Sequence, residues 1–279
     1  MTTLAEPAAP ATEDEAAAAK PRFRLRSRRD RLITIGSVIV LLGIWEVAAR
    51  QVDPILAAPP SAVLKALVTM AEEGSLHTAV LQSAKPFLSG YLLAIVVGVP
   101  LGLLIGRFRA VEAALGWLII AGYAMPMIAL IPVFVLWFGL GFAVKMAMVM
   151  VMTVFAIVIN TWNGVQNVPR ATIEVGMAFN ASQARILRQI VVPSVIPSIM
   201  TGLRIGIGKA VVGIVIAEFF TALGGIGGVI VEAGHSFQPD RMFAAVVVLM
   251  AAAVVLTWLI GIAERRLAPW NRSITGSGQ

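Results

Sequence analysis

The 279-residue sequence contains no cysteine, which excludes a disulfide framework and any cysteine-ligated metal site. Histidine is nearly absent: His77 and His235 both lie outside the long apolar segments, which argues against an intramembrane serine protease or metalloenzyme. Charged residues make up only 13% of the chain, against roughly 25% in soluble domains. Because 58% of the residues are hydrophobic, the composition indicates a polytopic membrane protein.

Long apolar segments recur along the chain, and a helix needs about 20 apolar residues to cross a bilayer. One segment is too long for a single helix and contains Pro126 and Pro132, which predicts a broken lead-in followed by a span ending near 138–141. We therefore expect an all-α membrane fold with about six transmembrane helices. The predicted spans are 32–49, 87–106, 110–142 with its break, 144–162, 194–220 and 242–263.

Polar tails flank the apolar region. Residues 1–30 are rich in alanine, proline and acidic residues and then become basic, which predicts a disordered, basic cytoplasmic tail. The transmembrane domain is expected over 31–265 and a cytoplasmic C-terminal tail over 266–279. The net charge of +7 does not indicate a nucleic-acid partner, because the N-terminal basic cluster stands just before the first span, where such residues set topology or contact anionic membrane lipid.

The distribution of basic residues predicts the orientation of the spans, because cytoplasmic loops carry an excess of Lys and Arg. With a cytoplasmic N-terminus, 15 basic residues lie in inner segments and 5 in outer segments. Both termini and the loop 163–193 are therefore predicted to be cytoplasmic. In the external segment 57–83, Pro59-Pro60-Ser61 predicts a turn, and apolar residues from Val63 to Met70 predict a short amphipathic helix on the outer surface.

The loop 163–193 is far longer than the usual connection of about 4–6 residues. Pro169 suits the start of a helix over 170–179, and Asn180 suits a left-handed turn after it. Ser182 can cap a second helix over 183–192, and Pro193 is expected to mark the entry to the next span.

The second predicted helix of this loop has a narrow apolar face, formed by the pairs Ile186–Ile190 and Leu187–Val191. Such a face suits a groove on a partner protein. Small residues such as Gly176 and Ala178 would let backbones approach closely. Glu174, Arg185 and Arg188 could add charge pairs that orient the partner.

The pattern of the loop resembles the cytoplasmic loop of permease subunits of bacterial ABC importers. That pattern is Glu-Ala-Ala, three residues, Gly, nine residues, Ile, one residue, Leu-Pro. Glu174, Ile190 and Pro193 match it in type and register, whereas Val175, Gly176, Asn180 and Val192 replace the two Ala, the Gly and the Leu. Further phrases over 59–265 resemble the branch that serves sulfonates, taurine, nitrate and some pyrimidines: Pro59-Pro60-Ser61, GVPLG at 98–102, Ile131-Pro132, LWFG at 136–139 and Ala217-Glu218-Phe219.

The resemblance implies the ABC importer permease fold in a bacterial cytoplasmic (inner) membrane. It implies a second permease copy, most simply as a homodimer, two cytoplasmic ABC ATPase subunits and an extracytoplasmic solute-binding protein. The translocated solute would be a small anion such as a sulfonate, taurine or nitrate. The residues that would couple to the ATPase are Glu174, Val175, Gly176, Asn180, Arg185, Arg188, Ile190 and Pro193.

No nucleotide site is expected in this chain. Gly208-Lys209 resembles the end of a phosphate-binding loop, but Leu203 stands where the first glycine belongs, and Ala210 replaces the required Ser or Thr. The chain is therefore expected to be a non-catalytic transport subunit that binds no cofactor or metal, with ATP used by a partner.

Polar residues within the spans are candidates for the substrate pathway, because such residues usually face a cavity or a partner. We name Asn160, Lys209 and Glu218. A packing role for Asn160, an internal salt bridge for Lys209 and a structural role for Glu218 are the alternatives. Residues 223–229 (LGGIGGV) are too glycine-rich for a regular helix, which predicts a re-entrant turn or a flexible connection.

Glycines spaced four apart, at 98, 102 and 106 and at 202 and 206, predict close helix packing within one subunit, with a dimer face or a pore lining as alternatives. An ion-coupled secondary transporter is the second functional reading. It would show two similar halves and membrane carboxylates, but the sequence has no evident repeat and few acidic residues in its spans.

Overall fold

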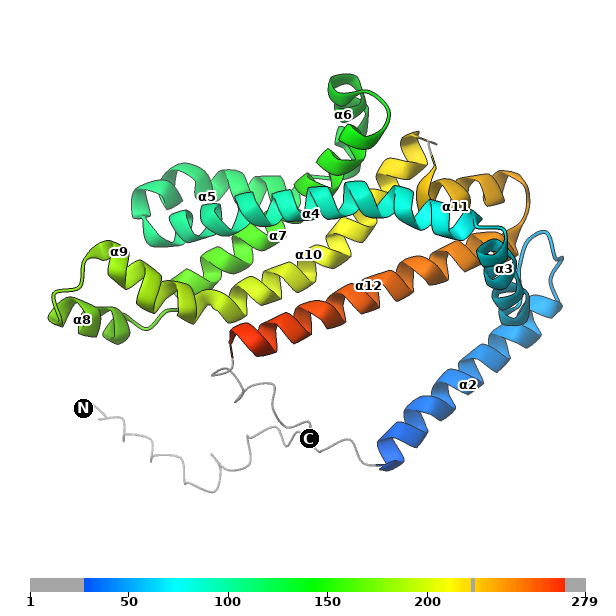
Figure 1. Ribbon diagram of the computed structural model, residues 1–279, viewed down its shortest axis with the longest axis horizontal. Helices are drawn as coiled ribbons and strands as arrows, with labels where there is room; N and C mark the ends of the chain where they lie inside the picture. Colours follow the sequence, from blue (N-terminus) through cyan, green and yellow to red (C-terminus); the bar gives the residue numbers. More distant parts are fainter. Residues whose placement is uncertain (1–27, 222–223, 269–279) are drawn as a thin grey trace, which may run out of the picture.

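The computed structural model describes residues 28–221 and 224–268, so most of both predicted tails lies outside the described residues. Every regular element in the described part is a helix, which confirms the all-α prediction. Figure 1 shows the helices side by side in an elongated body, with α6 and α2 projecting from it. The long helices are α2 (Arg28–Arg50), α4 (Ser75–Arg107), α7 (Phe142–Gln166), α10 (Val192–Thr221) and α12 (Pro239–Leu267).

Five helices of the described part are long and apolar enough to cross a membrane. A sixth candidate is the pair of α5 (Arg109–Ala124) with η1 (Met127–Leu130) and α6 (Ile131–Phe138), which is bent by 93°. The bend follows from Pro126, because the residue before a proline avoids the helical conformation and Met125 is extended. The predicted break is confirmed, and the five to six candidate spans agree with the predicted number of about six.

The core lies where α4, α7 and α10 pack together, and small residues bring these helices close. A Cβ added at Gly102 of α4 would stand 2.6 Å from Cβ of Thr161 on α7, and one at Gly202 of α10 would stand 3.0 Å from Cβ of Asn160. The first distance would force a neighbour to shift, and the second is tighter than most real Cβ contacts, so glycine lets these helices approach closely. The predicted packing role of these glycines within one subunit is confirmed.

Two helices extend beyond the predicted spans. Helix α4 begins at Ser75, twelve residues before the predicted start of the second span, and it continues through Pro86 and Pro100. Helix α10 is preceded without a break by the last helices of the loop, so one helical run covers Gln183–Thr221. Pro193 therefore does not mark a boundary, contrary to the prediction.

Two short helices, α3 (Pro60–Glu72) and α11 (Gly225–His235), lie at the end of the body opposite α8 and α9 (Figure 1). The predicted short helix is confirmed in α3, which buries Val63 and Met70. The predicted turn at 59–61 is wrong in part, because Pro60 already occupies the first turn of α3. The prediction for 223–229 is wrong for its described part: the chain turns at Gly224, with φ of 62°, and a regular helix starts at Gly225.

Helix α2 contacts the rest of the subunit mainly at its C-terminal end. There the Glu46 carboxylate accepts hydrogen bonds from the backbone N–H (3.0 Å) and the hydroxyl (2.8 Å) of Ser61, in the first turn of α3. Trp45 packs edge-on against Phe243 of α12, with ring centroids 5.6 Å apart. Only 6% of the apolar span of α2 is buried, so this helix is held by its end and exposes its sides.

Candidate functional site

The predicted loop between α7 and α10 forms a helical hairpin, which we call the hairpin: α8 (Arg170–Ala178), α9 (Gln183–Ile186) and η2 (Leu187–Val191), a π-helical turn. Helix α8 ends in a Schellman turn. The N–H of Ala181 donates to the carbonyl of Gly176 (3.1 Å), and that of Asn180 donates to the carbonyl of Met177 (2.9 Å). Asn180 has φ of 53°, so its predicted left-handed conformation is confirmed.

The second arm of the hairpin begins as an α-helix, as the sequence predicts, and then changes to a wider π-helical turn. The Ser182 hydroxyl accepts a hydrogen bond from the backbone N–H of Arg185 (3.3 Å), which confirms the predicted cap. The π-turn that follows comes directly before Pro193, whose ring would crowd the carbonyl four residues earlier in a regular α-helix. The N–H of Val192 instead bonds to the carbonyl of Leu187, five residues back, so the helix continues through the proline.

The apolar face of this second arm points largely into the subunit, whereas its Leu187 and Ile190 are only part-buried, and the predicted contact of this face with a partner stays a prediction. Ile186 is fully buried, and Val191 is 1% exposed. Both belong to the central core together with residues of α4 and α7. Gly176 is buried against this same face: a Cβ there would stand 2.7 Å from Cδ1 of Ile190. Gly176 thus lets the two arms of the hairpin approach each other. The close approach that a glycine permits here is used for packing within the subunit.

The surface that the hairpin exposes comes from α8. Phe179 is 82% exposed and Val175 57% exposed, one helical turn apart, and Met177, two residues from each along the chain, is 48% exposed. Glu174 is exposed on the same short helix. We call Glu174, Val175, Met177 and Phe179 the α8 surface. The position of Gly176 is the sequence signal for this surface. Gly176 marks the side of α8 that packs against the second arm, so the residues on either side of it in the sequence are left exposed.

Arg185 and Arg188 are exposed on the second arm, as predicted, and make no ion pair with any described residue. Two polar contacts support this end of the subunit. Arg107, at the end of α4, donates to the side chain of Gln183 at the start of α9. Gln166, at the end of α7, donates to Glu112 of α5 (2.7 Å). The first contact ties the hairpin to the end of α4, and the second ties the end of α7 to α5.

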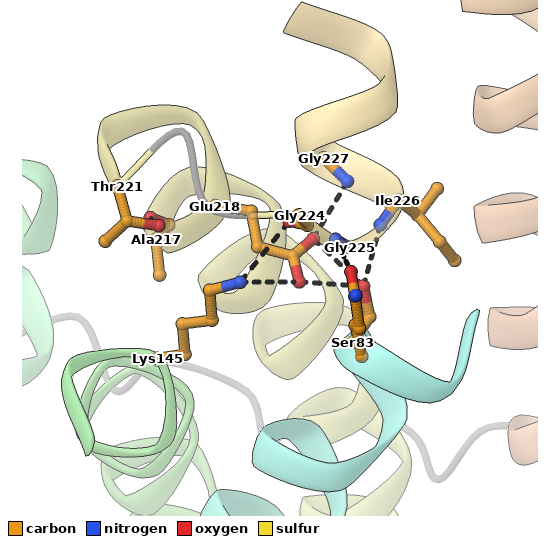
Figure 2. Close-up of polar contacts among 10 residues, drawn as sticks. Ser83, Lys145, Ala217, Glu218, Thr221, Gly224, Gly225, Ile226 and Gly227 are labelled. Atoms are coloured by element: carbon orange, nitrogen blue, oxygen red, sulfur yellow. Dashed lines mark hydrogen bonds and ion pairs between the residues drawn. The ribbon is translucent and has the colours of Figure 1, made fainter. Parts of the chain in front are cut away.

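A second polar cluster lies at the other end of α10, and we call it the junction. It joins α4, α7, α10 and the first turn of α11 (Figure 2). The Glu218 carboxylate of α10 is fully buried and accepts hydrogen bonds from the Ser83 hydroxyl (2.7 Å) and the Gly227 N–H (2.8 Å). Lys145 of α7, 5% exposed, places its Nζ 3.5 Å from the same carboxylate and donates to the carbonyl of Gly224 (3.3 Å).

The junction accounts for the regular start of α11 in a glycine-rich segment. The first N–H groups of a helix have no partner within the helix. Here the N–H of Gly225 donates to the Gln82 side chain, and the N–H of Ile226 donates to the Ser83 hydroxyl, both over 2.8 Å. A Cβ at Gly227 would stand 2.7 Å from Cβ of Glu218, so glycine is required for this approach. Sequence analysis missed the junction because its members lie far apart in the chain.

The three predicted pathway residues have different surroundings. Asn160 donates to the carbonyl of Ala156 within α7 (2.8 Å) and packs against Gly202. Lys209 is exposed, and its Nζ lies 5.4 Å from the ring centroid of Tyr123 instead of in a salt bridge. The described contacts of Glu218 are internal to the subunit and support its structural alternative. The pathway role of these three residues stays a prediction.

No group of three or more potential metal ligands occurs within residues 28–221 and 224–268. The architecture, a bundle of apolar spans with a helical hairpin at one end, defines a polytopic membrane protein. The chain matches the family described as binding-protein-dependent transport system inner membrane component over residues 98–269, and it belongs to this family. It is a permease subunit of an ABC importer, located in the inner membrane.

Relatives of known name support this assignment. The taurine transport system permease protein TauC of Escherichia coli is 28% identical over 91% of this chain and 94% of its own length. The formylaminopyrimidine transport permease protein ThiX of Halalkalibacterium halodurans is 32% identical, covering 84% and 94%. The putative aliphatic sulfonates transport permease protein SsuC of Bacillus subtilis is 27% identical, covering 85% and 87%.

A solved structure supports the fold. A chain of the MetNI methionine ABC transporter, in an inward-facing crystal form, superposes with a TM-score of 0.60. The match covers 71% of this chain and 97% of that chain at 20% identity. The predicted ABC importer permease fold is therefore confirmed.

Proposed function

We propose that the α8 surface docks onto a cytoplasmic ABC ATPase and transmits the energy of ATP hydrolysis to the spans. The observation that carries this proposal is the 82% exposure of Phe179 next to exposed Val175 on a helix held to its own subunit by Gly176. Exposed apolar side chains on a short, firmly anchored helix suit a groove on a partner protein. Glu174 of the α8 surface and Arg185 and Arg188 of the second arm are exposed charges that can orient the partner.

The charge distribution supports a cytoplasmic location for the hairpin. The 15 basic residues of the predicted inner segments exceed the 5 of the outer segments, which favours cytoplasmic N- and C-termini. The α8 surface then faces the compartment that contains ATP. The chain itself binds no cofactor in this proposal, and the separate ATPase binds and hydrolyses the nucleotide.

The family name and the relatives support the remaining parts of the assembly. A binding-protein-dependent system delivers its solute from an extracytoplasmic binding protein, and the permease would act as a homodimer with two ATPases in a bacterial cytoplasmic membrane. Because the relatives include taurine and aliphatic sulfonate permeases, we propose a small sulfonate-like anion, with nitrate in the same class, as the solute. A pyrimidine compound is the second candidate, because one relative is a formylaminopyrimidine permease.

Copurification of the ATPase with the permease tests the docking proposal. Phe179→Asp is expected to reduce ATPase retention at least tenfold, because it places a charge in the apolar contact. Glu174→Arg is expected to abolish solute uptake while leaving the permease in the membrane. Phe237→Asp is the matched control, because Phe237 is also exposed (68%) but lies beyond α11 at the other end of the body. Full ATPase retention by the Phe179 variant would refute the docking surface.

The solute is tested separately with the binding protein. We expect sulfonates or taurine, and not pyrimidines, to raise its melting temperature and to compete for uptake by the complete transporter. Stabilisation by a pyrimidine alone would reassign the solute without affecting the docking proposal.

A further inference from the structure

The hairpin and the junction lie at the two ends of a single helical run. This run covers Gln183–Thr221, 39 residues, and a helix of that length measures about 58 Å at 1.5 Å per residue. Its first turns belong to the hairpin, and Glu218 stands in its last turn. In Figure 1, α10 leads from the α8–α9 end of the body toward α11. A tilt of α10 produced at the hairpin must therefore displace Glu218.

At the junction, Glu218 is bonded to the helix that follows α10. Its carboxylate receives the N–H of Gly227, and the Ser83 hydroxyl bridges the same carboxylate to the N–H of Ile226. Charge-assisted hydrogen bonds of this kind are roughly twice as strong as neutral ones. The carboxylate is buried at 0% exposure, and Lys145 balances its charge. The start of α11 is thus fixed to the last turn of α10.

Helix α11 also forms a wall of an open pocket of about 730 Å³. The opposite wall is the beginning of α4, including Thr78 and Gln82, and α11 contributes Glu232 and His235. In the orientation proposed above, this pocket opens to the outside. A displacement of α11 would therefore change the surface that the transporter presents to an arriving solute or binding protein.

We propose that Glu218 and Lys145 are positioning residues for transport, which tie α11 to α10 so that movement of the hairpin reaches the outer surface. The inference rests on the proposed docking of the hairpin to an ATPase. Glu218 accepts a hydrogen bond from the N–H of Gly227 directly, and it holds the N–H of Ile226 through the Ser83 hydroxyl. Lys145 acts by placing its Nζ 3.5 Å from the buried carboxylate.

The double variant Lys145→Met/Glu218→Leu tests this role in the complete transporter, reconstituted with its ATPase and binding protein in lipid vesicles. The double change removes both charges together, so no uncompensated charge is left buried and assembly is expected to persist. Uptake per ATP hydrolysed is expected to fall at least tenfold. Arg204→Met/Glu264→Leu is the control: it removes an ion pair between α10 and α12 (2.5 Å) and is expected to change this ratio less than twofold.

A merely structural role would lower the amount of assembled transporter and leave uptake per ATP unchanged, and that result would overturn the inference. If the double variant does not assemble, Ser83→Ala decides, because it removes only the hydroxyl that joins Glu218 to Ile226. We expect it to lower uptake per ATP at least threefold; a ratio within twofold of the unmodified chain would equally overturn the inference. Failure of the docking proposal is distinguishable, because the Phe179→Asp permease would then retain its ATPase in full, whatever the junction variants do.

Discussion

Asn180 determines how the hairpin turns, because the chain reverses there through a residue with φ of 53°. Left-handed conformations are unfavourable for most residues, but Gly adopts them freely and Asn tolerates them. Asn180 stands where the family pattern that the loop resembles has glycine, and its positive φ preserves the conformation that glycine would supply. This turn sets the direction of α8, and of the exposed Phe179 at its end, relative to the second arm.

Substitutions at Asn180 should follow this conformational preference. Asn180→Gly is expected to leave stability and ATPase retention nearly unchanged. Asn180→Val is expected to destabilise the turn by about 1–2 kcal/mol, because a β-branched residue is poorly suited to positive φ. Thermal unfolding of the purified permease and ATPase copurification measure both effects. Equal behaviour of the Val and Gly variants would show that the turn does not depend on this backbone conformation.

At single positions, sequence reasoning succeeded where the cause is local and failed where it is tertiary. The left-handed Asn180 and the capping Ser182 follow from their neighbours in the chain and were predicted. Which side of the hairpin faces outward depends on α4 and α7, so the burial of Ile186 was not predicted. The pairing of Lys145 with Glu218 joins residues 73 apart, and no local pattern indicates it.

Among the elements, the contact between α4 and α7 depends on glycines that leave no room for a side chain. Gly102→Ala is expected to destabilise the subunit by about 1–3 kcal/mol, because the added methyl meets Thr161 at 2.6 Å. Gly208→Ala on α10 is the matched control, because nothing lies within 4 Å of its added Cβ. The control is expected to be neutral or stabilising by about 0.5–1 kcal/mol, since alanine favours the helix. Denaturation of the two purified variants compares them, and equal stability would contradict the packing role.

Helices whose formation depends on the length of an apolar segment were predictable from the sequence. Helices that depend on polar contacts with other elements were less so. The long apolar segments and the proline at position 126 predicted the candidate spans and the break between α5 and α6. The helical start of α11 was missed because glycine-rich segments are poor helix formers by themselves. Side chains from α4 and α10 supply the hydrogen bonds that this helix lacks locally, and these become visible only in the folded subunit.

The whole molecule has two chemically different ends, the hairpin end and the α11 end, and the proposed orientation assigns them to opposite sides of the membrane. The absence of cysteine allows a direct test with Ser182→Cys and His235→Cys, each at an exposed position. A membrane-impermeant thiol reagent added to intact cells is expected to label the His235 variant. The Ser182 variant should react only after permeabilisation, and the opposite pattern would invert the proposed topology.

The π-turn at Leu187–Val191 has a geometric consequence for the direction of the hairpin. A π-turn holds one residue more than the α-helical turn it replaces, and each residue of an α-helix rotates the chain by about 100°. A chain one residue shorter at this place could form an ordinary turn, and its α8 would then emerge on a different side of the long helix. The number of residues before Pro193 therefore determines the direction in which Phe179 points from the long helix.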